Sequence, residues 1–225
     1  MLRHLLGDGN VQSYIVQLLL SLPVCLLALS VHETAHGYVA YKLGDPTAHN
    51  LGRLTLNPAK HLDPFGFLSM VLFGFGWAKP VPINTRYFKN PKRDMALTGV
   101  AGPISNLLLA VIFALLMKLF YLGIDYVRFP NENVFMMAVY FRSFLYYGIY
   151  LNVALAIFNL IPVPPMDGSR LLFALLPSNL YFKIMRYEQY IYIIMLVLLF
   201  FGVLTPVISF LTNAVMNLIF AAFSL

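Results

Sequence analysis

The sequence predicts an all-α polytopic membrane protein, that is, one that crosses a bilayer several times. Apolar residues make up 60% of the chain and charged residues only 11%, whereas soluble domains carry about 45–50% and about 25%. Several apolar stretches also reach the roughly 20 residues that a helix needs to cross a bilayer. These observations exclude an ordinary soluble enzyme and a disordered chain. We expect about five to six transmembrane helices in a single membrane-embedded domain that covers residues 1–225.

The candidate spans follow one another along the chain. The first begins at residue 11, runs through apolar residues to 31 and keeps a helical pattern to about Leu43, where Gly44-Asp45-Pro46 stops it. Two later spans, with apolar stretches at about 95–121 and about 144–161 (or from 134), complete a core of about 10–175. A pair of C-terminal helices at about 188–223 follows, with apolar stretches at about 190–203 and 205–223.

A short apolar stretch lies between the first and second spans. Residues 67–78 are too few to cross a bilayer as a helix, and they contain two glycines and the only tryptophan, Trp77. Pro80-Val81-Pro82 follows directly. We therefore expect a short re-entrant or β-like element at 67–83.

Basic residues predict how the chain is oriented. The loops at 37–94 and 162–187 hold eleven of the 15 Lys and Arg residues, and cytoplasmic loops carry such an excess. The opposite side holds the other four, namely Arg3, Lys118, Arg128 and Arg142. We expect both loops on the cytoplasmic face of an inner or plasma membrane, with the lipid bilayer around the helices. No basic run alternates with aromatic residues outside the apolar segments, which argues against a nucleic-acid partner.

A metal-binding pattern lies at the end of the first span. The run from His32 to His36 reads H-E-T-A-H, and two histidines four residues apart lie on one face of a helix. Two such nitrogens can share one Zn²⁺, and Glu33 can take a proton from a water on the metal. Ionisable side chains are costly at this depth and mark functional sites. Cys25 is the only cysteine, so a cysteine-based metal cluster is excluded.

Catalytic zinc has three protein ligands and one open position. We expect Asp167 to be the third ligand, because it follows a Pro-rich break at the end of a span on the same side as His36. Gly168 beside it permits a close approach of the backbone. The alternative for Asp167 is an Asx-type turn or helix cap near Arg170.

These residues resemble the site-2 protease family of intramembrane zinc metalloproteases. The resemblance rests on the H-E-x-x-H pattern, followed by Asn159-x-x-Pro162 and by Asp167-Gly168. It implies that His32, His36 and Asp167 bind one Zn²⁺ per chain and that Glu33 is the catalytic general base and then acid. Further matches, to the compact branch of that family without a PDZ or CBS domain, place the resemblance over about 30–170. They are Gly44–Ala48, Gly52–Pro58, His61–Gly66, Gly76–Pro82 and Ala101–Asn106.

The resemblance also implies roles for two asparagines. Asn159 would position the scissile peptide or its oxyanion, and Asn106 would be a second polar group near the cleft. Hydrogen bonding between helices is the alternative for both. His61 and Asp63 match the same branch, either as anchors of a loop or as site residues.

The implied activity is hydrolysis of a peptide bond in or near the transmembrane helix of a membrane-protein substrate. That helix must unwind locally, and its extended backbone could pair with the glycine-containing stretch at 67–78 by β-augmentation. Two other functions could use the same residues, namely transport of a divalent metal and an inactive membrane scaffold. No internal repeat supports a transporter, and transport gives Glu33 no task. The sequence is also compatible with a homo-oligomer.

Overall fold

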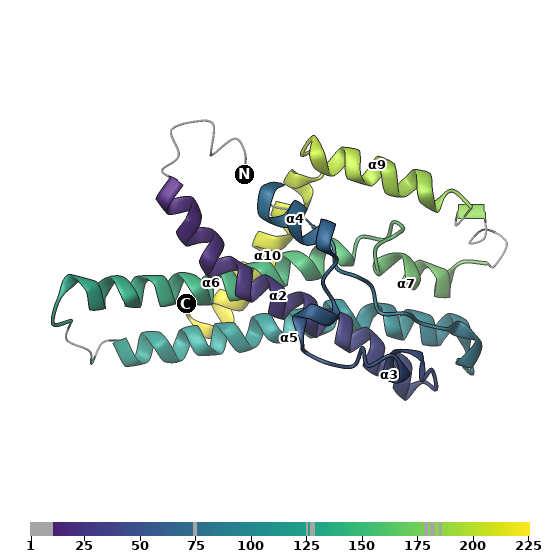
Figure 1. The fold of residues 1–225 in the computed structure, drawn as a ribbon, viewed down its shortest axis with the longest axis horizontal. Helices are drawn as coiled ribbons and strands as arrows, with labels where there is room; N and C mark the ends of the chain where they lie inside the picture. Colours follow the sequence, from purple (N-terminus) through teal and green to yellow (C-terminus); the bar gives the residue numbers. More distant parts are fainter. Residues whose placement is uncertain are drawn as a thin grey trace.

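Helices make up most of the computed structural model (Figure 1). The structure describes residues 11–73, 76–124, 126, 129–177, 180, 183, 184 and 186–225. Arg3 and Arg128, which entered the charge comparison, lie outside these residues. The helices are α2 (Val11–Lys42), α3 (Thr47–Asn50), α4 (Pro64–Phe73), α5 (Pro91–Ile124), α6 (Glu132–Asn159), α7 (Gly168–Leu175), α9 (Glu188–Phe200) and α10 (Thr205–Phe223), with short 3₁₀ turns at Pro58–Lys60 and Thr85–Tyr87.

Four of these helices are long and apolar enough to cross a membrane, namely α2, α5, α6 and α10. The expected all-α polytopic membrane fold is therefore confirmed. The fifth apolar helix, α9, has 13 residues and is about 20 Å long, short of the roughly 30 Å of a hydrocarbon core. The described residues thus hold four full-length spans and this shorter helix, where we expected about five to six spans.

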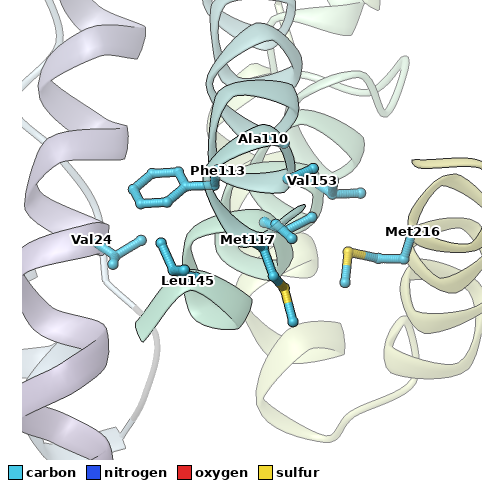
Figure 2. Close-up of a cluster of buried hydrophobic side chains, with 9 residues drawn as sticks. Val24, Ala110, Phe113, Met117, Leu145, Val153 and Met216 are labelled. Atoms are coloured by element: carbon cyan, nitrogen blue, oxygen red, sulfur yellow. The ribbon is translucent and has the colours of Figure 1, made fainter. Parts of the chain in front are cut away.

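The membrane helices pack around a small core. In Figure 1, α5 and α6 run side by side and α2 crosses them, and the contacts between elements agree. Figure 2 shows where they meet: Val24 of α2, Phe113 of α5, Leu145 of α6 and Met216 of α10 point toward one another. A Cβ at Gly148 would overlap the ring of Phe113. In lipid such close packing, rather than exclusion of water, holds helices together.

The element at 67–83 is part helix and part extended chain. It begins within α4, whose end is joined to α2 by a hydrogen bond from the Tyr14 hydroxyl to the Val71 carbonyl, 2.8 Å long. Residues 74 and 75 lie outside the described part of the chain. After them the chain forms no helix from Gly76 to Asn84, and Ala78 forms an isolated antiparallel bridge with Leu62. We call residues 76–84 the extended segment.

Polar groups from the loop after α2 hold the extended segment in place. The amide of Lys79 donates to the His61 carbonyl at 2.8 Å, and the buried Arg53 guanidinium donates to the Lys79 carbonyl at 2.7 Å. Farther along, the amide of Asn84 donates to the fully buried Asp45 carboxylate at 2.7 Å. The segment is therefore fixed from one side along most of its length.

His61 and Asp63, whose roles the sequence left open, anchor this same loop. The His61 Nε2 lies 2.7 Å from the Thr55 carbonyl, and the Asp63 carboxylate accepts from the Gly66 amide at 2.8 Å. Neither residue lines the cavity described below. Both side chains therefore have the local structural role that was one of the two expectations.

Candidate metal centre

The two histidines of the H-E-x-x-H pattern meet on the buried face of α2. One helical turn separates them, and the Nε2 atoms of His32 and His36 lie 3.0 Å apart. Both side chains are buried, each residue being 4% exposed. The spacing read from the sequence therefore brings two nitrogen ligands to one point.

Asp167 reaches that point from more than 130 residues away. Its Oδ2 lies 3.0 Å from the Nε2 of His32 and 3.0 Å from the Nε2 of His36. The chain leaves α6 at Asn159 and turns back at Gly168, where a Cβ would overlap the carbonyl oxygen of Leu160. This close return, which requires glycine, carries Asp167 back to the level of the histidines.

Each of the three side chains has a second atom held by the protein. The Nδ1 of His32 lies 2.6 Å from the Oδ1 of Asn106, and the Nδ1 of His36 lies 2.6 Å from the Thr98 carbonyl. The Oδ1 of Asp167 lies 3.5 Å from the Arg170 guanidinium. Partners of this kind fix the orientation and the tautomer of metal-ligating side chains.

The donor set fits a divalent cation. A carbonyl oxygen only accepts hydrogen bonds, so the Nδ1 of His36 carries a proton and its Nε2 presents a lone pair. The Asp167 carboxylate also only accepts, and its oxygen lies as close to both Nε2 atoms as they lie to each other. Lone pairs that converge in this way repel unless a proton or a metal lies among them. Two imidazoles and one carboxylate form a ligand set that zinc uses in catalytic sites.

Space and charge at the site agree with this assignment. A Cβ at Gly102 of α5 would lie 2.7 Å from the Nε2 of His32 and would also overlap His36. Only glycine at this position therefore leaves room for the two histidine rings. In the metal-free protein, where protons rather than a metal lie between the Nε2 atoms and Asp167, burial raises the pKa of the Asp167 carboxyl. Hydrogen bonds from the His32 and His36 rings, together with the positive charges of His36 and Arg170, outweigh burial and hold that pKa below its usual range. The carboxylate is therefore ionised and available to a cation.

Glu33 lies beside the metal ligands and faces the extended segment. Its Oε2 accepts a hydrogen bond from the backbone amide of Val81 at 2.8 Å. Pro80 and Pro82 have no amide hydrogen, so Val81 supplies the only backbone donor in that tripeptide. The Glu33 carboxylate is thus oriented by the extended segment.

A cavity of about 370 Å³ connects these groups. The three metal ligands and Glu33 line it, the extended segment forms one wall, and the end of α6 forms another. Asn159 is among the residues that line the cavity, while its Nδ2 donates to the Leu155 carbonyl at 2.9 Å. The position of Asn159 leaves its predicted contact with substrate open.

Asn106 has a different place. It is fully buried and is not among the residues that line the cavity. Its amide nitrogen donates to the Ala28 carbonyl at 3.1 Å and to the Oδ1 of Asn152 at 2.9 Å. Asn106 therefore makes the hydrogen bonds between helices that were the alternative expectation, because it points into the bundle behind His32.

Comparison with known proteins agrees with this geometry. A family model described as Peptidase family M50 matches residues 121–202. The "Putative zinc metalloprotease YwhC" of Bacillus subtilis is 41% identical over 192 residues, which are 85% of this chain and 83% of that protein. The chain belongs to peptidase family M50. This M50 peptidase is a zinc metalloprotease, and its apolar helices make it an integral membrane protein.

More distant relatives carry similar names. The "Putative zinc metalloprotease Rip2" of Mycolicibacterium smegmatis is 31% identical over 69% of this chain and 57% of its own length. "Zinc metalloprotease MJ0392" of Methanocaldococcus jannaschii is 29% identical over 68% of this chain and 34% of its own length. The M50 peptidase thus spans about half of Rip2 and a third of MJ0392. No solved structure matches the chain significantly.

Proposed function

We propose that this M50 peptidase is an intramembrane endopeptidase, which hydrolyses a peptide bond in or near the transmembrane helix of a membrane-protein substrate. His32, His36 and Asp167 hold one Zn²⁺, and Glu33 is the general base. The observation that carries the proposal is that these four residues and the extended segment line one cavity. That cavity lies among helices long enough to span a membrane.

The extended segment supplies an edge to which substrate can bind. Ala78 faces Leu62 across an antiparallel bridge, and the flanking amide of Lys79 bonds to the His61 carbonyl. In such a non-hydrogen-bonded pair the N–H and C=O of Ala78 point away from the partner strand, and Ala78 lines the cavity. An unwound substrate backbone would pair with Ala78 by β-augmentation, next to the metal ligands.

The residues around the cavity account for the proton transfers of hydrolysis. His32, His36 and Asp167 would hold the zinc, which when bound would lower the pKa of a water to about 7 and polarise a substrate carbonyl. Glu33 takes the proton of the attacking water and then donates it to the leaving amine. The Val81 amide keeps the Glu33 carboxylate directed into the cavity. In this proposal Asn159, which lines the cavity, orients the scissile peptide or its oxyanion.

The proposal includes an orientation in the membrane. Lys and Arg residues gather in the loops around the metal centre, which favours the cytoplasmic side for that end of the bundle. The same charge rule places the loop between α5 and α6 on the opposite side. One membrane-embedded domain then presents its cavity near the cytoplasmic face, where water can enter.

Cleavage in liposomes tests the proposal. The purified protein is reconstituted with a panel of single-span membrane proteins and, separately, with an unfolded soluble protein. We expect cleavage of a single-span substrate that a chelator abolishes and zinc restores, and a loss of about 100-fold or more in Glu33→Gln. Glu132→Gln, an exposed glutamate at the start of α6, is the matched control and retains activity.

Three results would contradict the proposal or a part of it. If only the unfolded soluble protein were cleaved, the chain would be a zinc protease but not an intramembrane protease. Zinc uptake into the liposomes without cleavage of any substrate would favour the transporter. Normal cleavage by Glu33→Gln would remove Glu33 as the base.

A further inference from the structure

Asn152 is a buried polar residue that the catalytic groups leave unexplained. It lies on α6, is fully buried, and does not line the cavity. Its Nδ2 donates to the carbonyl of Gly148 one turn earlier, at 2.8 Å. Its Oδ1 accepts from the Nδ2 of Asn106 at 2.9 Å. Asn106 in turn contacts the Nδ1 of His32 at 2.6 Å, so a continuous chain of hydrogen bonds runs from α6 to a metal ligand.

The direction of every bond in this chain is fixed by two carbonyl groups. The Gly148 carbonyl can only accept, so the Asn152 atom beside it is the NH₂ group and its other atom is the oxygen. The Ala28 carbonyl on α2 fixes the Asn106 amide in the same way, at 3.1 Å. Both hydrogens of the Asn106 NH₂ group are therefore used, and its oxygen faces His32.

This polarity determines the tautomer of His32. Because the Asn106 atom that faces the Nδ1 of His32 is an acceptor, Nδ1 must carry the proton. The Nε2 atom then presents its lone pair toward Asp167 and His36, as a metal ligand requires. A flipped Asn106 amide would place NH₂ against Nδ1 and favour the wrong tautomer.

We propose that Asn152 is a positioning residue for the metal centre, which acts through Asn106 to hold His32 in the tautomer that binds zinc. The inference rests on the proposed function, since it takes His32 as a zinc ligand. Asn152 touches neither substrate nor metal. Its contribution is to secure the second hydrogen of the Asn106 NH₂ group, so that the amide keeps one orientation.

Zinc affinity in a double-mutant cycle tests the proposal. The full chain is purified in detergent, stripped of metal and titrated with zinc against a chelating dye. The variants are Asn106→Leu, Asn152→Leu and both together. Asn152→Ser is added because a serine hydroxyl can bond to the carbonyl of its own helix, which makes correct folding easier, but is too short to reach Asn106.

We expect Asn106→Leu to weaken zinc binding by about 10- to 100-fold, and each Asn152 variant by about 3- to 10-fold. The double variant should bind like Asn106→Leu alone, because Asn152 has no effect once Asn106 is gone. The Co²⁺-substituted Asn152 variants should also show an altered visible spectrum, which reports ligand geometry. Ser30→Ala is the matched control: its buried hydroxyl donates only within α2, to the Leu26 carbonyl at 2.7 Å, and its zinc affinity should not change.

Two results would overturn the proposal. Wild-type zinc affinity and Co²⁺ spectrum in both Asn152 variants would reduce Asn152 to a contact between helices. Independent, multiplicative losses in the double variant would show that Asn152 does not act through Asn106. If the wild-type chain itself binds no zinc, the metal centre fails and the positioning role fails with it, whereas the first two results leave the metal centre intact.

Discussion

Among single residues, the metal centre depends on groups that do not themselves bind metal. The carbonyl of Thr98, the side chain of Asn106 and the guanidinium of Arg170 each hold the second atom of one ligand. Gly102 contributes by lacking a side chain. Partners of this kind typically change metal affinity by about 10- to 100-fold, so they decide whether a correct ligand set binds well.

A methyl group at residue 102 should therefore displace the histidine ligands. We expect Gly102→Ala to weaken zinc binding by at least about 10-fold, because its Cβ would lie 2.7 Å from the Nε2 of His32. Gly123→Ala, on the same helix with no atom within 4 Å of the new Cβ, is the matched control. Competition with a chelating dye measures the zinc affinity of both variants. If Gly102→Ala bound zinc as tightly as Gly123→Ala, the helices would be able to move apart without weakening the site, and this prediction would be wrong.

The sequence predicted the ligands better than it predicted their supports. The spacing of His32 and His36 places both on one face of a helix. Asp167 follows the Pro-rich break after a later span, on the same side of the membrane as His36. The sequence therefore predicted that these three side chains meet. Thr98 and Val81 contribute backbone groups, which leave no signature in residue type. Asn152 was visible as a polar residue within an apolar span, but its partner depends on how α5 and α6 pack.

Among the secondary-structure elements, the extended segment links Glu33, the proposed general base, to the edge at which we propose that substrate binds. One side of it bonds to the loop after α2 through His61, Arg53 and Asp45. Other residues of the segment, including Ala78 and Val81, line the cavity, where the Val81 amide bonds to Glu33. A shift of this segment would therefore move the base and the substrate edge together.

Removal of the Val81 amide hydrogen tests this link. We expect Val81→Pro to lower kcat by about 10-fold or more with little change in zinc content, because Glu33 loses the donor that orients it. Val81→Ala keeps the amide and should stay close to wild type. Kinetics on a single-span substrate, with zinc measured on the same samples, compare the two, and equal kcat values in both variants would rule out the link.

Helix ends were the least predictable part of each element. The apolar pattern placed the third span at about 144–161, with residue 134 as the alternative start, whereas α6 begins at Glu132 and ends at Asn159. Asn131 caps its start by accepting from the Val134 amide at 3.0 Å. Hydropathy marks where lipid begins, but hydrogen bonding and capping decide where a helix begins.

For the whole molecule, composition alone indicated a polytopic membrane fold, and four spanning helices bear this out. What composition could not give is the crossing of α2 over α5 and α6, because in lipid that packing depends on shape rather than on an apolar stripe. Gly148 against Phe113 is one such detail. The orientation of the bundle in the membrane is a separate proposal, which rests on the distribution of charge.

Chemical labelling of single cysteines tests the orientation. In a Cys25→Ala background, Lys89→Cys and Asn133→Cys each place a thiol at an exposed position, on opposite ends of the bundle. We expect a membrane-impermeant maleimide to label residue 89 only in inverted vesicles and residue 133 only in right-side-out cells. The reverse pattern would place the metal centre on the outer face.

The ligand set itself is tested most directly by the zinc content of purified variants. Wild type and Glu33→Gln should each retain about one zinc per chain after dialysis, because a general base does not bind the metal. Asp167→Ala and His36→Ala should lose most of theirs, since each removes one of three ligands. A full equivalent of tightly bound zinc in Asp167→Ala, or none in the wild-type chain, would contradict the account.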